Sequence, residues 1–183
     1  MDYKDEIFEA ITQFAKTPDL YGFMQWLPAT VPLLLRRTVA KISAHEGSIW
    51  IVDSDNEQLV ICYNTAELAR HFSQPLSTGL VSKAYKEDRP VHHKGLKRYQ
   101  GASSAIDDQH AQKTQHQISV PFYLAGKLCG ALSAVQLSSD FHSLPRADVK
   151  WGFDDDASNS LVAIAIVIAE TIESEWKSQR GLE

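Results

Sequence analysis

The stretch that decides the fold is Gln117-Ile118-Ser119-Val120-Pro121-Phe122-Tyr123-Leu124-Ala125-Gly126-Lys127-Leu128-Cys129-Gly130-Ala131-Leu132. Two β-rich runs flank a short Ala-Gly-Lys segment, which predicts two adjacent strands joined by a tight turn. Pro121 belongs at an edge or a bulge of a sheet, and Gly130 inside the second run indicates a close approach of two backbones. The pattern predicts a hairpin whose second strand lies against another part of a sheet.

Outward from this hairpin, the hydrophobic periodicity predicts helices at both ends of the chain and strands between them. The predicted helices cover residues 2–16, 19–43 (broken near Pro28 and Pro32 and continuous from about 31), 79–85 and 154–180, and the strands cover 48–52, 59–63, 91–92, 117–124 and 127–137. The strand at 48–52 lacks polar alternation, so both of its faces should be covered. We expect an N-terminal amphipathic helix at 1–18 followed by a single domain at 19–180.

The bulk composition excludes several classes of protein. The 183 residues carry a net charge of −5, which is not the basic footprint of a nucleic-acid-binding protein. The longest apolar run, Leu161 to Ala169, is shorter than the roughly 20 residues of a membrane span. Cys62 and Cys129 both lie in apolar strand patterns, which fits a reducing compartment. We therefore expect a cytoplasmic protein without nucleic acid or membrane partners.

Several landmarks occur in the order found in one family of small sensor domains. They are the segments 48–53, 75–81, 89–91 and 118–121, with Gly126 and Gly130. Over about residues 20–176 the chain resembles the GAF family. The resemblance implies an α/β (α+β) fold with a central antiparallel sheet of five to six strands. Terminal helices would pack on one face, and short helices and loops would roof a ligand pocket on the other, as in GAF and PAS domains.

The resemblance also implies a set of ligand contacts. In members that bind cyclic nucleotides, the contacts come from set places along this framework, which fall here at Ser48, Tyr63, Asn64, Leu80, Val81, Asp107, His110, Thr114 and Ser133. Three of these positions keep the residue type expected, and Tyr63 offers a ring that could stack on a planar ligand.

The chain departs from the cyclic-nucleotide pattern at two places. Ser133 stands where an acidic residue is expected, and Gln136-Leu137 stands where an Asn-Lys pair is expected. The Lys–Asp clasp that closes such pockets is therefore missing. The resemblance then implies a pocket for some other small molecule, whose identity the sequence does not give, and no cofactor is assigned.

The sequence carries no phosphate-binding loop of defined spacing, no nucleophile elbow and no zinc motif. Some GAF relatives reduce free methionine sulfoxide with clustered cysteines on the pocket loops. Cys62 and Cys129 instead lie in strands that the family order separates by another strand, too far apart for a direct disulfide. The histidines between 92 and 116 are the local candidates for a haem ligand, but their spacing marks no site. We therefore expect a protein that is not an enzyme.

The last predicted helix is apolar nearly all round. One stripe consists of Leu161, Ile164, Ala165, Ile168 and Ile172, and Val162, Ile166 and Val167 lie off it. Such a helix needs two partners. One should be the sheet, and the other is either the N-terminal helix or a second subunit. Because GAF domains commonly dimerise through their terminal helices, we expect a homodimer.

Together these observations predict a sensor or regulatory GAF-like domain without catalysis. It would bind a small molecule over the sheet and signal, through its terminal helices, to a protein partner. One alternative is an interaction or dimerisation module whose vestigial pocket is filled by Trp50, Tyr63, Tyr85 and Tyr99. Another is a redox protein similar to the methionine sulfoxide reductases, or a haem-linked protein.

Overall fold

A computed structural model describes residues 2–17, 19–66, 72–94, 114–137 and 152–182. Its centre is a six-stranded antiparallel sheet with the order β3-β2-β1-β6-β5-β4. The strands are β1 (Glu46–Asp53), β2 (Gln58–Asn64), β3 (Ser73–Pro75), β4 (Val91–Lys94), β5 (Thr114–Leu124) and β6 (Lys127–Leu137). The predicted α+β architecture is confirmed.

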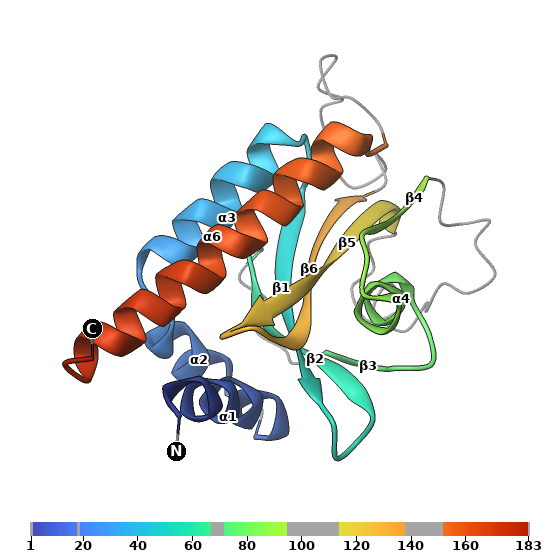
Figure 1. The fold of residues 1–183 in the computed structure, drawn as a ribbon. Helices are drawn as coiled ribbons and strands as arrows, with labels where there is room; N and C mark the ends of the chain where they lie inside the picture. The colour runs from blue at the N-terminus through green and yellow to red at the C-terminus, as the bar shows by residue number, and fades with distance from the viewer. Residues whose placement is uncertain (1, 18, 67–71, 95–113, 138–151, 183) are drawn as a thin grey trace.

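The described helices pack on both faces of the sheet (Figure 1). Those near the chain ends pack on one face: α1 (Tyr3–Lys16), α2 (Leu20–Trp26), α3 (Thr30–Lys41) and α6 (Asp155–Gln179). The short helix α4 (Leu80–Glu87) packs on the other face, against β4, β5 and β6. We call these the helix face and the α4 face.

Local sequence explains where the helices begin. Asp19 caps α2 by accepting from Gly22 N at 2.8 Å, and Asp154 caps α6 by accepting from Ala157 N at 2.9 Å. These side chains satisfy backbone donors that the first turn leaves unpaired. Pro32 lies in the first turn of α3, where a missing N–H costs nothing. The break predicted near the two prolines is thus confirmed.

The deciding hairpin forms as predicted. Ala125 and Gly126 make the turn with φ of 54° and 78°, the left-handed pair that suits a two-residue hairpin. Gly130 lies opposite Ile51, and a Cβ atom there would stand 1.8 Å from the carbonyl oxygen of Trp50. The close backbone approach expected from this glycine is therefore confirmed. Pro121 lies past the end of the pairing with β4, at an edge of β5.

Each cysteine is the extra residue of a β-bulge. Tyr63 pairs with Ile49 and Ile61 pairs with Trp50, so Cys62 has no partner on β1. The pairing of β5 with β6 skips Cys129 in the same way, between its neighbours on β6. A bulge shifts the alternation of side chains beyond it. This shift decides where the residues after Cys62 point.

The main core fills the helix face. It gathers Ile49 and Ile51 of β1, alternate residues of β5 from Ile118 onward, and the buried stripes of the four terminal helices. The outward neighbours Trp50 and Val52 are buried on the α4 face, so the prediction that β1 is covered on both sides is confirmed. α1 contributes Ile7 to the same core.

α6 packs on the sheet and also on a second element, the helix α3. The two helices lie side by side on the sheet (Figure 1). Leu161, Ile168 and Ile172 are buried in the core, whereas Ile166 is 55% exposed. Among the described residues, α6 is the one helix with the length and composition to cross a membrane, and its buried stripe is that of a core helix.

The three-residue strand β3 was not predicted from the residues. Its short pairing with β2 places Gln74 opposite Leu59. Pro75 ends it, as suits an edge strand.

Candidate functional site

A row of polar side chains crosses the α4 face. Asn64 on β2, Ser48 on β1, Ser133 on β6 and Ser119 on β5 are successive cross-strand partners. Side chains of directly paired residues point to the same face of a sheet. The indole Nε1 of Trp50 donates to Ser48 Oγ at 2.8 Å, and Trp50 packs with the residues beneath α4, so this row lies on the α4 face.

The hydroxyls of the row are buried and joined by hydrogen bonds. Ser119 Oγ donates to Ser133 Oγ at 3.0 Å, and Ser133 Oγ donates to the carbonyl oxygen of Ile118 at 3.1 Å. Gln117 Nε2 donates to both hydroxyls, at 3.3 Å and 3.0 Å. Ser119 and Ser133 are at most 1% exposed. Polar groups this deeply buried are tolerated because each finds a partner. We call Ser48, Ser119, Ser133 and Gln117 the serine floor.

The serine floor still has hydrogen-bonding capacity. Ser48 Oγ accepts from Trp50, and its own hydrogen has no acceptor among the described residues. The amide oxygen of Gln117 likewise has no donor in the part of the chain that the structure describes. A hydroxyl can donate once and an amide oxygen can accept twice. The floor can therefore offer both a donor and an acceptor to a polar ligand.

α4 is held beside this floor by a small polar cluster. Gln74 Nε2 donates to Ser82 Oγ at 2.8 Å, and Ser82 Oγ donates to the carbonyl oxygen of Pro75 at 2.9 Å. Gly79, with φ of 83°, turns the chain into the helix. Leu80 then packs on Val91, and Val81 packs on Trp50 and its neighbours. Both predicted contacts, Leu80 and Val81, are thus buried in the packing of α4.

The structure corrects the placement of Tyr63. Its side chain lies in the core of the helix face, away from the serine floor, and its hydroxyl has no partner among the described residues. Simple alternation from Ile61 would have put Tyr63 on the α4 face. The extra residue at Cys62 shifts the alternation by one and turns the ring to the other side.

The remaining predicted residues are distributed as follows. The structure brings Ser48, Asn64 and Ser133 into one row. Thr114 pairs with Leu137 at the far end of β5. It lies five residues before Ser119, which is roughly 16 Å along a strand. Asp107 and His110 lie outside the described residues.

Sequence reasoning missed Gln117 and Ser119. A signal for them was present, because polar and apolar residues alternate along 117–120, which places both polar side chains on one face. Gln136, where the family pattern predicted an asparagine, has a structural role. Its Nε2 donates to Ser43 O at 2.9 Å, and its Oε1 accepts from Gly152 N at 2.7 Å. It ties the end of β6 to the chain that enters α6.

Part of the α4 face is filled by aromatic side chains. Trp50 is buried there, and Tyr85 packs against the same cluster. Of the four residues predicted to fill a vestigial pocket, Tyr63 lies on the opposite face and Tyr99 lies outside the described residues. The aromatic packing therefore borders the serine floor on the side of α4.

The two thiols are buried in the helix face. Burial raises the pKa of Cys62 to about 12. Burial likewise raises the pKa of Cys129 far above the usual range of a thiol. β1 lies between the two strands that carry them. Both are free thiols, and as placed they are protonated at neutral pH, which is the unreactive form.

A scan against protein-family models and a search of curated proteins each found no match. Solved structures do match. The GAF domain of a phosphoenolpyruvate-protein phosphotransferase from Coxiella burnetii aligns over 100% of both chains, with a TM-score of 0.62 and 16% identity. The GAF-B domain of DevS from Mycobacterium smegmatis aligns over 84% of this chain and 98% of its own, with a TM-score of 0.57 and 18% identity. This chain has a GAF-like fold.

The comparison corrects the expectation that the protein is not an enzyme. A type II free methionine-R-sulfoxide reductase from Thermoplasma acidophilum aligns over 85% of this chain and 96% of its own, with a TM-score of 0.61 and 18% identity. Enzymes therefore share this GAF-like fold, and the absence of recognisable catalytic motifs does not separate sensors from enzymes. At this identity the likeness concerns the fold alone.

Proposed function

We propose that this chain is a cytoplasmic sensor or regulatory module that binds a small polar molecule on the serine floor. The observation that carries the proposal is the row of buried hydroxyls on the α4 face, in a fold shared with GAF domains. Small-molecule sites commonly place a few polar groups among apolar side chains, where they fix the orientation of the ligand. The two free cysteines support a reducing compartment.

The mechanism would be differential binding. A ligand on the floor contacts β1, β6 and β5 together, and β5 also packs against α6. A ligand that prefers one arrangement of these strands shifts the population toward it. α6 ends near the N-terminal helices (Figure 1). A change in the position of α6 would therefore alter the surface that these terminal helices present, and a protein partner would bind that surface.

Native mass spectrometry on protein purified without added ligand tests this proposal. We expect a retained small-molecule mass that disappears after the protein is unfolded, washed and refolded. Protein that carries no mass, and that binds nothing when returned to a small-molecule extract of its host, would contradict it.

A homodimer through the terminal helices is part of the proposal. Val167 on α6 is 40% exposed and Leu33 on α3 is 48% exposed, so both neighbouring helices present apolar side chains to solvent. Val167→Glu should convert the dimer to a monomer in light scattering, whereas Glu175→Gln on the same helix should not. A monomeric wild-type protein would contradict this part.

The neighbours also support a second candidate, reduction of free methionine-R-sulfoxide. Cys62 and Cys129 are the two thiols of the chain, so the chemistry would require at least one of them to leave its buried position. The test is thiol-dependent consumption of methionine-R-sulfoxide by the wild type and by Cys62→Ala and Cys129→Ala. Turnover lost in either variant supports the reductase, and no turnover in the wild type contradicts it.

A further inference from the structure

A groove of about 480 Å³ runs between α6 and β5, away from the serine floor. Val162, Ile166 and Ala169 line it from α6, and Pro121 and Tyr123 line it from β5. Ile166 is 55% exposed and Tyr123 is 40% exposed. Small-molecule sites commonly have volumes of about 300–1,000 Å³ and apolar walls, so the groove has the size and lining of a ligand site.

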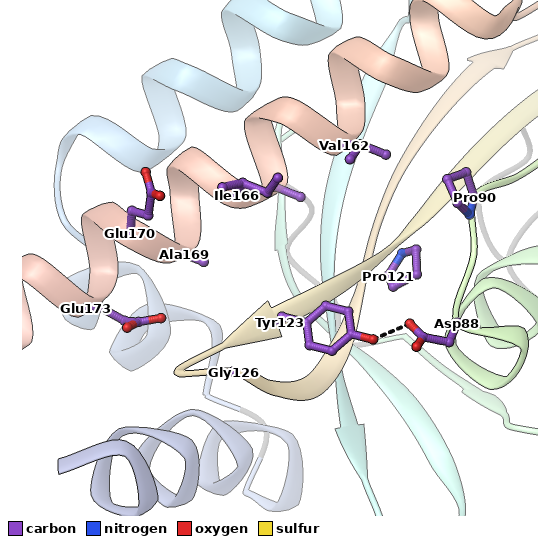
Figure 2. A pocket seen from close by; sticks show the side chains of 11 residues that line it. Asp88, Pro90, Pro121, Tyr123, Gly126, Val162, Ile166, Ala169, Glu170 and Glu173 are labelled. Carbon is purple, nitrogen blue, oxygen red and sulfur yellow. Dashed lines mark hydrogen bonds between the residues drawn. The ribbon is translucent and has the colours of Figure 1, made fainter.

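The edge of β5 in the groove is unsuited to an added strand. β4 pairs with β5 only as far as Ser119, so the following residues have an outer edge without a strand partner in the described chain. Pro121 lies on this edge, and Pro90, the residue before β4, lies near it on the same side of the groove (Figure 2). Neither residue has a backbone N–H to donate. An extended peptide would therefore find few backbone partners here.

Three carboxylates line the groove, and two of them are held in place. Asp88 accepts from the hydroxyl of Tyr123, and Glu173 Oε1 accepts from Ala125 N at 2.6 Å. Glu170 is exposed on α6. None of the three forms an ion pair with a described residue, and no basic side chain is among the described residues that line the groove. The groove therefore favours a cation.

Figure 2 shows how the acidic and the apolar side chains are distributed along the groove. Glu170 and Glu173 lie toward one end, on α6, and Asp88 lies at the other end beside Tyr123. The side chain of Ile166 and the ring of Tyr123 lie between them. A matching ligand has cationic groups at both ends and an aliphatic segment between them.

We propose that this groove binds a linear aliphatic polyamine. Each ammonium group donates to a carboxylate, and each carboxylate keeps at least one free lone pair after its contact within the protein. The methylene segments cover Ile166 and the ring of Tyr123. This site is separate from the serine floor and does not depend on the proposed function.

Isothermal titration of the full chain with spermidine, at fixed ionic strength, tests the proposal. Glu170→Gln should weaken binding by about threefold, the effect of losing one exposed ion pair. Ile166→Ser should weaken it by about tenfold, because apolar contact area is lost. Glu175→Gln is the matched control, since it removes the same charge from α6 outside the groove, and it should leave affinity unchanged.

Two further probes separate a built site from general attraction to an acidic protein. Mg²⁺ at equal charge concentration should not displace spermidine, and the uncharged 1,8-octanediol should not bind. Ser133→Ala, on the serine floor, should bind spermidine as the wild type does. Spermidine displaced by Mg²⁺, or weakened equally by Glu170→Gln and Glu175→Gln, would overturn the proposal.

Discussion

The two faces of one sheet differ in what they bury. On the helix face, residues such as Ile118 and Ile49 pack into a continuous apolar core beneath four helices. On the α4 face, their immediate neighbours Ser119 and Ser48 bury hydroxyls, and in the part of the chain that the structure describes one short helix, α4, packs beside them. Apolar burial supplies most of the stability of a fold, whereas a satisfied buried hydrogen bond adds little. The helix face therefore supplies most of the stability of the domain, and the side chains of the α4 face can serve ligand binding.

The largest loss of stability should come from a substitution at Gly130, where the backbone of β6 lies close to that of β1. Gly130→Val places side-chain atoms on the carbonyl of Trp50, so we expect a loss on the order of 5 kcal/mol in the free energy of unfolding, or failure to fold. Urea denaturation measures it. The control is Gly126→Ala in the turn, where nothing lies within 4 Å and only the positive φ is strained, at about 1 kcal/mol. Equal losses of unfolding free energy in the two variants would contradict the close approach of Gly130 to the Trp50 carbonyl.

The next test replaces an apolar residue on the helix face. Ile118 is fully buried, and Ile118→Ala should lower the free energy of unfolding by about 3 kcal/mol through lost burial and the cavity left behind. Urea denaturation again gives the value. A loss below about 1 kcal/mol would mean that the helix face does not carry the stability assigned to it.

The buried thiols make the stability of the helix face depend on pH. The pKa of Cys62 is raised to about 12 by burial, whereas a thiol in the unfolded chain ionises near its ordinary value of about 8.5. The unfolded state thus releases a proton that the folded state keeps. Stability should fall as pH rises through this window, by about 1.4 kcal/mol per pH unit from Cys62. Urea denaturation from pH 8 to 11 should show a shallower slope for Cys62→Ala, and an unchanged slope would contradict the buried placement.

The smallest effect is expected on the α4 face, one residue along from Ile118. In Ser119→Ala, Ser133 keeps its bond to the carbonyl of Ile118 and Gln117 keeps its bond to Ser133. We therefore expect a loss of about 1 kcal/mol in thermal or urea unfolding. A cost equal to that of Ile118→Ala would mean that the serine floor is a structural element of the core.

The sequence predicted the fold well because its signals are local. The alternation along 117–120, the acidic caps of the helices and the apolar run of β1 each act over a few residues. The three-residue β3 was missed because its pairing with β2 comes from tertiary contact. Of the predicted site, Ser48 and Ser133 do meet, but Tyr63 was placed on the wrong face. A bulge cannot be seen in the local pattern, and one extra residue reverses every side chain after it.

The most direct test asks whether ligand binding depends on the α4 face and not on the helix face. It compares the ligand retained by variants of two neighbouring residues, one on each face. Native mass spectrometry would be run on the wild type, on Ser133→Ala of the α4 face, and on the volume-conserving Leu132→Met of the helix face. We expect the wild type and Leu132→Met to retain a small-molecule mass and Ser133→Ala to lose it. Equal retention in all three proteins, or no retained mass in the wild type, would contradict this expectation.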